Sequence, residues 1–217
     1  ALLRTRISGI CGTDLELLRG YQAFSGVPGH EFVADIVRAP GREDLEGERA
    51  VADINCGCGS CRDCLCGNMS HCPHRSVVGI RGRDGAFADY LAAPVENLHI
   101  LPRDMPDRLA VFAEPLAAAL RVTQQIHITA TMRLAVLGDG KMGLLTAMAL
   151  RHVNPDLLLI GRHKDKLGLF QRLGGRILLA EPGQNVSLPA GAEDGFDLVV
   201  EATGNPAGIE QASRMCR

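Results

Sequence analysis

The sequence has little of several features that mark particular classes of protein. Aromatic residues make up only 4% of its 217 residues, and the formal net charge is only −2. No run of lysine and arginine stands out, so a nucleic-acid or anionic-membrane surface is not supported. No apolar stretch approaches the roughly 20 residues that cross a bilayer. Residues 1–7 have neither an apolar signal core nor an initiator methionine. We therefore expect a cytoplasmic protein whose true N-terminus is missing.

Cysteine, in contrast, is concentrated in one loop. Six of the eight cysteines lie between residues 55 and 72. Four of them have the spacing C-x2-C-x2-C-x7-C, namely Cys58, Cys61, Cys64 and Cys72. Four thiolates on a short, glycine-containing loop can surround zinc and leave no coordination position open, so such a site supports folding. Disulfide bonds are the alternative, which adjacent CxxC pairs without other secretory marks disfavour. Cys56 and Cys66 are left over and could replace a neighbour if the register shifted.

A second group of candidate ligands precedes this loop. An alternating pattern at residues 3–7 predicts a half-buried strand, which runs into Gly9-Ile10-Cys11-Gly12-Thr13-Asp14. Further on, Pro28-Gly29-His30-Glu31 leads into an apolar strand at residues 32–37. Taken separately, Cys11 would usually be a small buried apolar residue, and His30 a core residue with satisfied hydrogen bonds.

Together, these segments resemble the zinc-containing medium-chain alcohol and polyol dehydrogenases. The cysteine loop is similar to the structural zinc lobe of that family, and G-I-C-G-T-D followed by P-G-H-E is similar to its catalytic zinc signature, in the family's order. The resemblance implies that Cys11 and His30 bind a catalytic zinc and that Thr13 passes on the substrate proton. Asp14 would orient His30, and Glu31 would be a ligand or a close neighbour of the metal.

A third ligand is suggested by Phe112-Ala113-Glu114-Pro115-Leu116-Ala117. This segment resembles the E-P-L-A segment of the sorbitol, threonine and glucose dehydrogenase branch, in which Glu114 would replace a cysteine of the ethanol-type enzymes. The alternative is that Glu114 is only an acidic residue favoured by the dipole of a helix's first turn. Whether Glu31 or Glu114 is the third ligand stays open. Three further histidines are interpreted as surface or structural residues: His71, His74 and His99.

After Glu114, strand patterns alternate with helix patterns. Residues 134–137 form an apolar run typical of a strand buried on both faces, followed by Gly138-Asp139-Gly140-Lys141-Met142-Gly143 and a helix over 144–151. Between a buried strand and a helix, G-x-G-x-x-G is a dinucleotide fingerprint. Further strands are predicted at 157–160, 177–180 and 197–201, and helices at 165–173 and 206–216. The predicted cofactor-binding residues are Gly138, Gly140, Lys141, Met142, Gly143, Arg162, His163, Ala202, Thr203 and Gly204.

The predicted fold is α/β with two domains. Residues 1–121 would form a GroES-like β-barrel catalytic domain with the zinc sites, including short strands within 85–92 and 97–102. Residues 122–217 would form a Rossmann parallel-sheet domain, linked to the first by an Ala-rich helix that begins at Leu116. The resemblance covers essentially the whole chain, but both ends of the family pattern are absent. We therefore expect an incomplete Rossmann domain.

The end of the second nucleotide-domain strand predicts cofactor choice. NAD enzymes place an acidic residue there to accept hydrogen bonds from the adenosine ribose. Here the strand ends in Gly161-Arg162-His163-Lys164. Gly161 brings no negative charge, and Arg162 could pair with a 2′-phosphate, with His163 or Lys164 assisting. NADP is therefore predicted in preference to NAD, unless these are simply solvated residues that begin a helix.

The resemblance implies a zinc-dependent oxidoreductase that moves hydride between NADP and a primary or secondary alcohol of polyol, sugar or amino-alcohol type. The rival is a non-catalytic, zinc-stabilised dinucleotide sensor of the same fold, which would need only the closed cysteine site. The expected partners are a small alcohol or carbonyl substrate and further copies of the chain, in a dimer or tetramer. No nucleic-acid or membrane partner is expected.

Overall fold

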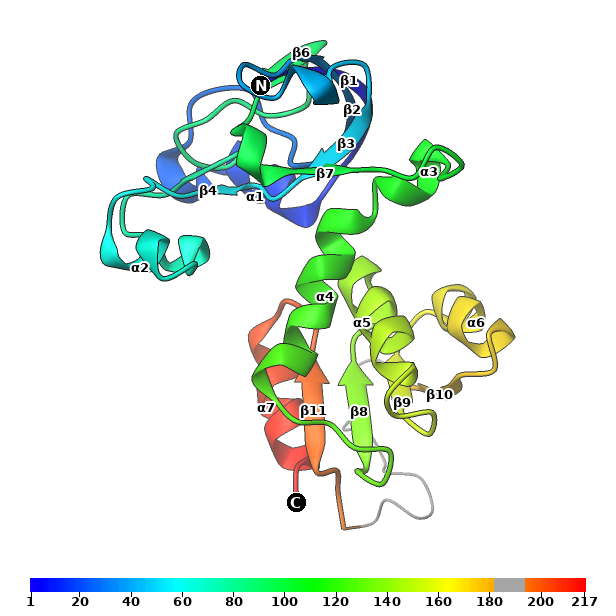
Figure 1. Cartoon of the computed structure of the whole chain (residues 1–217). Helices are drawn as coiled ribbons and strands as arrows, with labels where there is room; N and C mark the ends of the chain where they lie inside the picture. Colours follow the sequence, from blue (N-terminus) through cyan, green and yellow to red (C-terminus); the bar gives the residue numbers. More distant parts are fainter. Residues whose placement is uncertain (182–193) are drawn as a thin grey trace. The chain divides into compact units, whose positions relative to one another are not determined.

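The computed structural model describes residues 1–181 and 194–217, which divide into two compact units, Ala1–Glu114 and Pro115–Arg217 (Figure 1). The first unit contains an antiparallel sheet and the second a parallel sheet, which confirms the predicted fold class. The units divide within helix α4 (Ala113–Gln125). The predicted domain boundary at 121/122 falls in the same helix and stays a prediction. No helix in the described ranges has the length and hydrophobicity needed to cross a membrane.

The first unit is built on a five-stranded sheet in the order β6-β1-β2-β3-β7. The alternation near the N-terminus does form a strand, and β1 buries Leu3 on the core face while its arginines face solvent. Its antiparallel pairing with β2 brings Gly9 opposite Glu31, at one end of the sheet. The strands are β1 (Leu2–Gly9), β2 (Glu31–Arg38), β3 (Arg49–Ala52), β6 (Tyr90–Ala92) and β7 (Leu98–Ile100).

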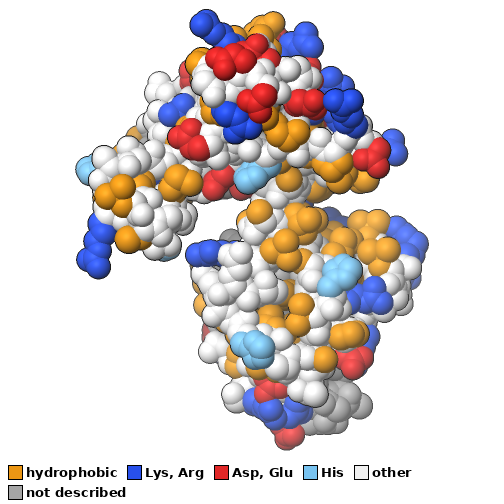
Figure 2. Space-filling view, viewed as in Figure 1, with side chains coloured by type: hydrophobic (Ala, Val, Ile, Leu, Met, Phe, Trp, Pro, Cys, Tyr) orange, Lys and Arg blue, Asp and Glu red, His pale blue; other side chains and the backbone are white. Residues whose placement is uncertain are grey.

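Short elements surround this sheet. The cysteine loop follows β4 (Asn55–Cys56), which pairs with β5 (Ser76–Val77) and so closes the loop at its base. Acidic and basic side chains are interspersed on the face of this unit seen in Figure 2. The helices and 3₁₀ turns are α1 (Gly12–Leu18), η1 (Tyr21–Ala23), η2 (Glu43–Leu45), α2 (Arg62–Leu65), η3 (Met69–His71), η4 (Val95–Asn97) and α3 (Asp107–Ala110).

The strand expected within residues 85–92 is shorter than predicted, because only Tyr90–Ala92 pairs with the sheet. The preceding residues bond to a different loop. Gly85 N donates to the carbonyl oxygen of Val27 at 2.7 Å, and Ala86 N donates to that of Gly29 at 2.9 Å. A Cβ at Gly85 would lie 2.1 Å from the Gly29 oxygen, so only glycine fits this approach. The segment therefore supports the loop that leads to His30.

The second unit is a parallel sheet in the order β10-β9-β8-β11, against which its helices pack (Figure 1). Strands β8 and β9 are buried along their whole length, as the apolar runs predict. The chain leaves β8 in one direction for β9 and β10 and later adds β11 on the other side. Such a reversal creates a crevice at the carboxyl ends of the two central strands. The elements are β8 (Leu134–Leu137), α5 (Lys141–Arg151), β9 (Leu158–Gly161), α6 (Lys164–Arg172), β10 (Arg176–Leu179), β11 (Leu198–Glu201) and α7 (Pro206–Met215).

Candidate metal centres and dinucleotide site

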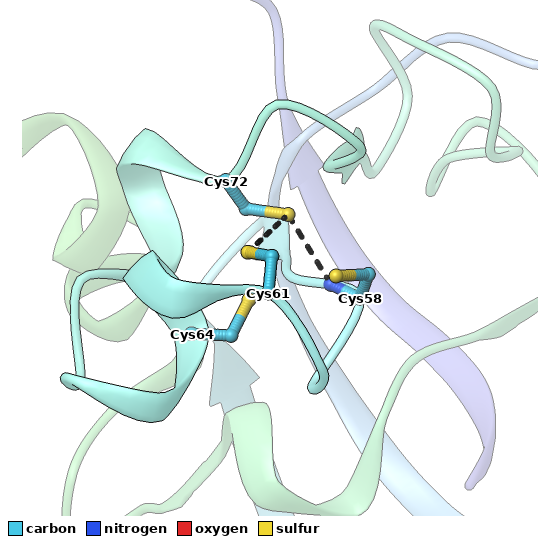
Figure 3. Close-up of side chains that lie close together, drawn as sticks. All are labelled: Cys58, Cys61, Cys64 and Cys72. Carbon is cyan, nitrogen blue, oxygen red and sulfur yellow. Dashed lines mark hydrogen bonds between the residues drawn. The ribbon is translucent and has the colours of Figure 1, made fainter.

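The four cysteines of the predicted zinc lobe converge in the structure (Figure 3). Each offers a sulfur, and the four sulfurs lie within 4.8 Å of one another: Cys58, Cys61, Cys64 and Cys72. Gly57 makes room for this arrangement, since a Cβ there would lie 2.7 Å from the Cys64 Sγ. The leftover cysteines lie outside the group, with Cys56 buried in β4 and Cys66 exposed. The register predicted from the spacing is therefore the one that the structure shows.

The thiols of this group compete for protons. Hydrogen bonds from the backbone and hydroxyl of Ser60 lower the pKa of Cys58 to about 5. For Cys61, a backbone N–H of Cys64 lowers the pKa, but burial and the neighbouring thiols outweigh it and raise the pKa to about 12. Sulfur contacts are correspondingly close, with Cys61 Sγ 3.7 Å from Cys72 Sγ. A divalent cation can take the place of the protons that these thiols share. Four cysteine sulfurs are a donor set typical of structural zinc.

A second group of metal-binding atoms consists of Cys11, His30 and Glu31, which also lie within 4.8 Å of one another. Cys11 precedes helix α1, His30 immediately precedes β2, and Glu31 is the first residue of β2. Gly9, opposite Glu31 in the β1–β2 pair, allows this carboxylate to fold over it, because a Cβ there would lie 2.5 Å from Glu31 Oε2. Both His30 and Glu31 are buried.

Asp14 holds both halves of this second group in position. Its Oδ2 accepts a hydrogen bond from the backbone N–H of Cys11 at 2.7 Å, which caps α1. Its Oδ1 lies 3.2 Å from His30 Nδ1, and both side chains are 3–4% exposed. Because Nδ1 faces the carboxylate, Nε2 is the nitrogen that remains for a metal. One thiol, one imidazole and one carboxylate are a donor set that zinc binds while keeping a position open for a ligand.

The structure separates the two glutamates that were candidate third ligands. Glu31 belongs to the three-residue group, whereas among the described residues Glu114 does not. Glu114 lies in the first turn of α4 and is half-buried. Its role as a ligand stays a prediction. Thr13 lies close to the group, with its Oγ1 3.8 Å from Cys11 Sγ. The three histidines interpreted as surface or structural residues, His71, His74 and His99, are exposed.

The predicted dinucleotide residues gather around a cavity of about 290 Å³ in the second unit. Six of the ten line it: Gly138, Gly140, Arg162, His163, Ala202 and Thr203. Gly143 serves packing instead, since a Cβ there would lie 1.9 Å from the Gly138 carbonyl oxygen. A Cβ at Gly138 would lie 2.7 Å from backbone atoms of Ala202, so β8 and β11 approach closely only because this residue is glycine. The remaining three predicted residues, Lys141, Met142 and Gly204, are not in the described lining.

Sequence reasoning missed Asp139, the residue between the first two glycines of the fingerprint. It is buried, and its Oδ2 accepts hydrogen bonds from the backbone N–H groups of Arg162 at 2.8 Å and His163 at 2.6 Å. His163 Nδ1 lies 2.9 Å from its Oδ1. Burial alone would raise the pKa of Asp139, but the bonds from His163 and Arg162 lower it. The sequence could have indicated this role, because an acidic residue between the glycines of a buried turn needs hydrogen-bond partners.

Asp139 also explains why residue 161 is glycine. A Cβ at Gly161 would lie 2.5 Å from the Asp139 side chain. The lining of the cavity further includes Lys166 of α6, and not Lys164, which the sequence had suggested as an assisting charge.

Comparison with known proteins identifies the family of the chain. The family described as the alcohol dehydrogenase GroES-like domain matches residues 1–103. Alcohol dehydrogenase TADH from Thermus sp. ATN1 is 30% identical with a TM-score of 0.85, covering 100% of this chain and 67% of its own. The chain belongs to the zinc-containing medium-chain alcohol dehydrogenase family. The resemblance inferred from the two cysteine motifs is confirmed.

Two further members of this family are informative. L-threonine 3-dehydrogenase of Bacillus licheniformis is 32% identical over 227 residues, covering 99% of this chain. The chain spans 65% of that relative's length. A structure described as a zinc-binding dehydrogenase from Sinorhizobium meliloti 1021 contains NADP; it is 30% identical, with a TM-score of 0.86, and the match covers 100% of this chain and 66% of that one. Zinc and a nicotinamide dinucleotide, the predicted cofactors, are the cofactors of the family.

Proposed function

We propose that the protein is a zinc-dependent oxidoreductase that transfers hydride between NADP and a primary or secondary alcohol of polyol, sugar or amino-alcohol type. The observation that supports this is the group of Cys11, His30 and Glu31, in which the described residues bring three donors together beside the hydroxyl of Thr13. A site that only supported folding would be closed, as the four-cysteine site is. Nothing in the comparisons supports the rival interpretation as a non-catalytic dinucleotide sensor.

The side chains have separate tasks in this reaction. Zinc, when bound, supplies Lewis-acid chemistry to a substrate oxygen, and a nicotinamide dinucleotide accepts the hydride. Cys11, His30 and Glu31 would hold the metal, and Asp14, whose Oδ1 lies 3.2 Å from His30 Nδ1, would orient the imidazole. Thr13 would take the hydroxyl proton of the alcohol and pass it toward solvent, so that one hydride and one proton leave the substrate together.

The preference for NADP is supported by the charges around the dinucleotide cavity. Arg162 and Lys166 place two cationic side chains on its lining, beside His163. Asp139 is the one carboxylate in the described lining, and it is engaged by His163 and by two backbone N–H groups. An adenosine 2′-phosphate would therefore meet positive charge, and an arginine fork binds phosphate through two parallel hydrogen bonds.

The proposal is tested by alcohol-dependent nicotinamide reduction, measured with NADP and with NAD over a panel of polyols, sugars and amino-alcohols. Wild-type protein should favour NADP, and Cys11→Ser should abolish turnover while Cys66→Ser, outside both metal groups, should not. Arg162→Ala should lower kcat/KM for NADP by about ten- to a hundredfold and leave NAD nearly unchanged. Lys164→Ala is the matched control. Full turnover by Cys11→Ser would refute the metal assignment, and a wild-type preference for NAD would refute the cofactor assignment alone.

A further inference from the structure

We propose that the cavity beside Thr13 binds the anionic group of an alcohol substrate, a carboxylate or a phosphate, through Arg75 and Arg81. This inference rests on the proposed function, because only that function makes the ligand of the cavity a substrate. It narrows the substrate from alcohols in general to alcohols that carry a carboxylate or phosphate group near the reacting carbon.

The cavity lies in the first unit and has a volume of about 430 Å³. Thr13 forms part of its lining and connects it to the metal-binding group through the 3.8 Å contact with Cys11 Sγ. Ile54, Val77 and Ile80 contribute an apolar wall. Small-molecule sites commonly combine such a wall with a few polar groups that fix orientation. A compound whose hydroxyl group reaches Thr13 would therefore place the rest of its body in this cavity.

Two arginines on the same lining have unused hydrogen-bonding capacity. Arg75 Nη1 donates to the carbonyl oxygen of Ser70 at 2.5 Å, but its Nε is buried and has no hydrogen-bond partner among the described residues. Arg81 is exposed on the lining and pairs with no carboxylate in the described part of the chain. Because neither guanidinium is neutralised by a carboxylate in the described part of the chain, a ligand in the cavity that brings acceptor oxygens to them would gain charge-assisted hydrogen bonds.

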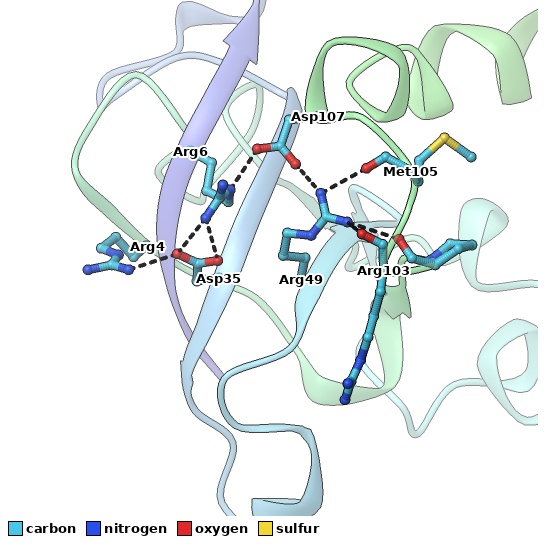
Figure 4. Close-up of polar contacts among 8 residues, drawn as sticks. Arg4, Arg6, Asp35, Arg49, Arg103, Met105 and Asp107 are labelled. Carbon is cyan, nitrogen blue, oxygen red and sulfur yellow. Dashed lines mark hydrogen bonds and ion pairs between the residues drawn. The ribbon is translucent and has the colours of Figure 1, made fainter.

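Several arginines elsewhere in this unit are paired with carboxylates (Figure 4). Arg4 and Arg6 contact the Asp35 carboxylate at 2.8 and 3.2 Å. Arg6 and Arg49 both bond to Asp107, and the Arg6 bond holds the pKa of Asp107 below its usual value. Arg75 and Arg81, in contrast, line the cavity and have no carboxylate partner among the described residues.

The cavity also has one acidic lining residue, Glu16, but it does not neutralise the arginines. Glu16 Oε1 pairs with Arg19 at 2.6 Å, and its side chain is 54% exposed. The lining therefore keeps a surplus of positive charge next to Thr13. The planar fork of arginine matches the oxygens of carboxylate and phosphate, which makes an anionic alcohol a better ligand than its neutral counterpart.

The test measures binding by calorimetry on the zinc-loaded protein without nicotinamide, so that its outcome does not depend on turnover. Two matched pairs of probes separate the sources of charge: D-gluconate against D-sorbitol for carboxylate, and glycerol 3-phosphate against glycerol for phosphate. We expect the anionic member of at least one pair to bind at least tenfold more tightly. The pair that shows the preference identifies the anion.

Arg81→Gln should abolish this preference, and Arg81→Lys should retain part of it. Arg62→Gln, an exposed arginine of α2, is the control and should behave as wild type. Arg75→Gln is the second variant, with zinc content measured because Arg75 also bonds to the loop beside Cys72. The inference is overturned if neither pair shows an anionic preference, or if Arg81→Gln keeps it. Anion binding without alcohol-dependent nicotinamide reduction would instead uphold the arginine site and refute the proposed reaction.

Discussion

At the scale of single residues, Asp139 shows how one buried carboxylate can organise a binding site. It joins the first glycine turn to the end of β9 by accepting two backbone N–H bonds and facing the His163 ring. Hydrogen bonds to an ionised acceptor are stronger than neutral ones, which offsets the cost of burial. The side chains of Arg162 and His163 are in this way fixed at the edge of the dinucleotide cavity.

Asp139→Asn should destabilise the protein and make its free energy of unfolding depend less on pH in the acidic range. The pKa of Asp139 is lowered in the folded state, so its contribution is present above the unfolded pKa of about 3.9 and is lost as pH falls through the folded pKa. We expect a loss of about 1–2 kcal/mol at pH 7 and a shallower fall in stability below about pH 4. Urea unfolding from pH 3 to 7 measures both. Equal stability of the two proteins at pH 7 would show that Asp139 does not join the two segments.

At the scale of elements, the cysteine lobe depends on how closely its backbone approaches its sulfurs. Gly57 follows β4 and passes next to Cys64, and the turn at Gly59 has a φ of 74°, which favours glycine. The β4–β5 pair then holds the two ends of the loop together. Zinc would hold the rest of the loop in place, because its helix α2 has only four residues and cannot be stable alone.

Gly57→Ala should weaken zinc binding by the lobe without replacing any ligand. The added Cβ would lie 2.7 Å from Cys64 Sγ, closer than packed atoms allow, so the sulfur must move. Zinc release to a chelator should become at least tenfold faster, with a lower melting temperature. Gly168→Ala on helix α6 is the control, since its Cβ would meet nothing closer than 3.6 Å and alanine favours helix. Unchanged zinc release by Gly57→Ala would show that the lobe is not closely packed around its sulfurs.

At the scale of the whole molecule, local motifs were predictable from the sequence and contacts between distant segments were not. The segments around Cys11 and around His30 and the glycine fingerprint are short patterns, and the family resemblance that they carry implied the fold class and the candidate centres, with Glu31 and Glu114 both left as possible ligands. The strand expected from residue 85 was too long, because bonding to the loop at residues 27–29 cannot be read from alternation. The two arginines of the cavity beside Thr13 are likewise more than 60 residues away from Thr13 in sequence.

The central claim is that this chain holds an open zinc centre as well as a closed one. Elemental analysis of the purified protein measures it most directly, as zinc ions per chain. The account predicts two in the wild type, and one in Cys11→Ser with the fold intact. It also predicts loss of the other zinc and a marked loss of stability in Cys61→Ser, because structural zinc contributes directly to folding. One zinc per chain in the wild type, or two retained by Cys11→Ser, would contradict the account.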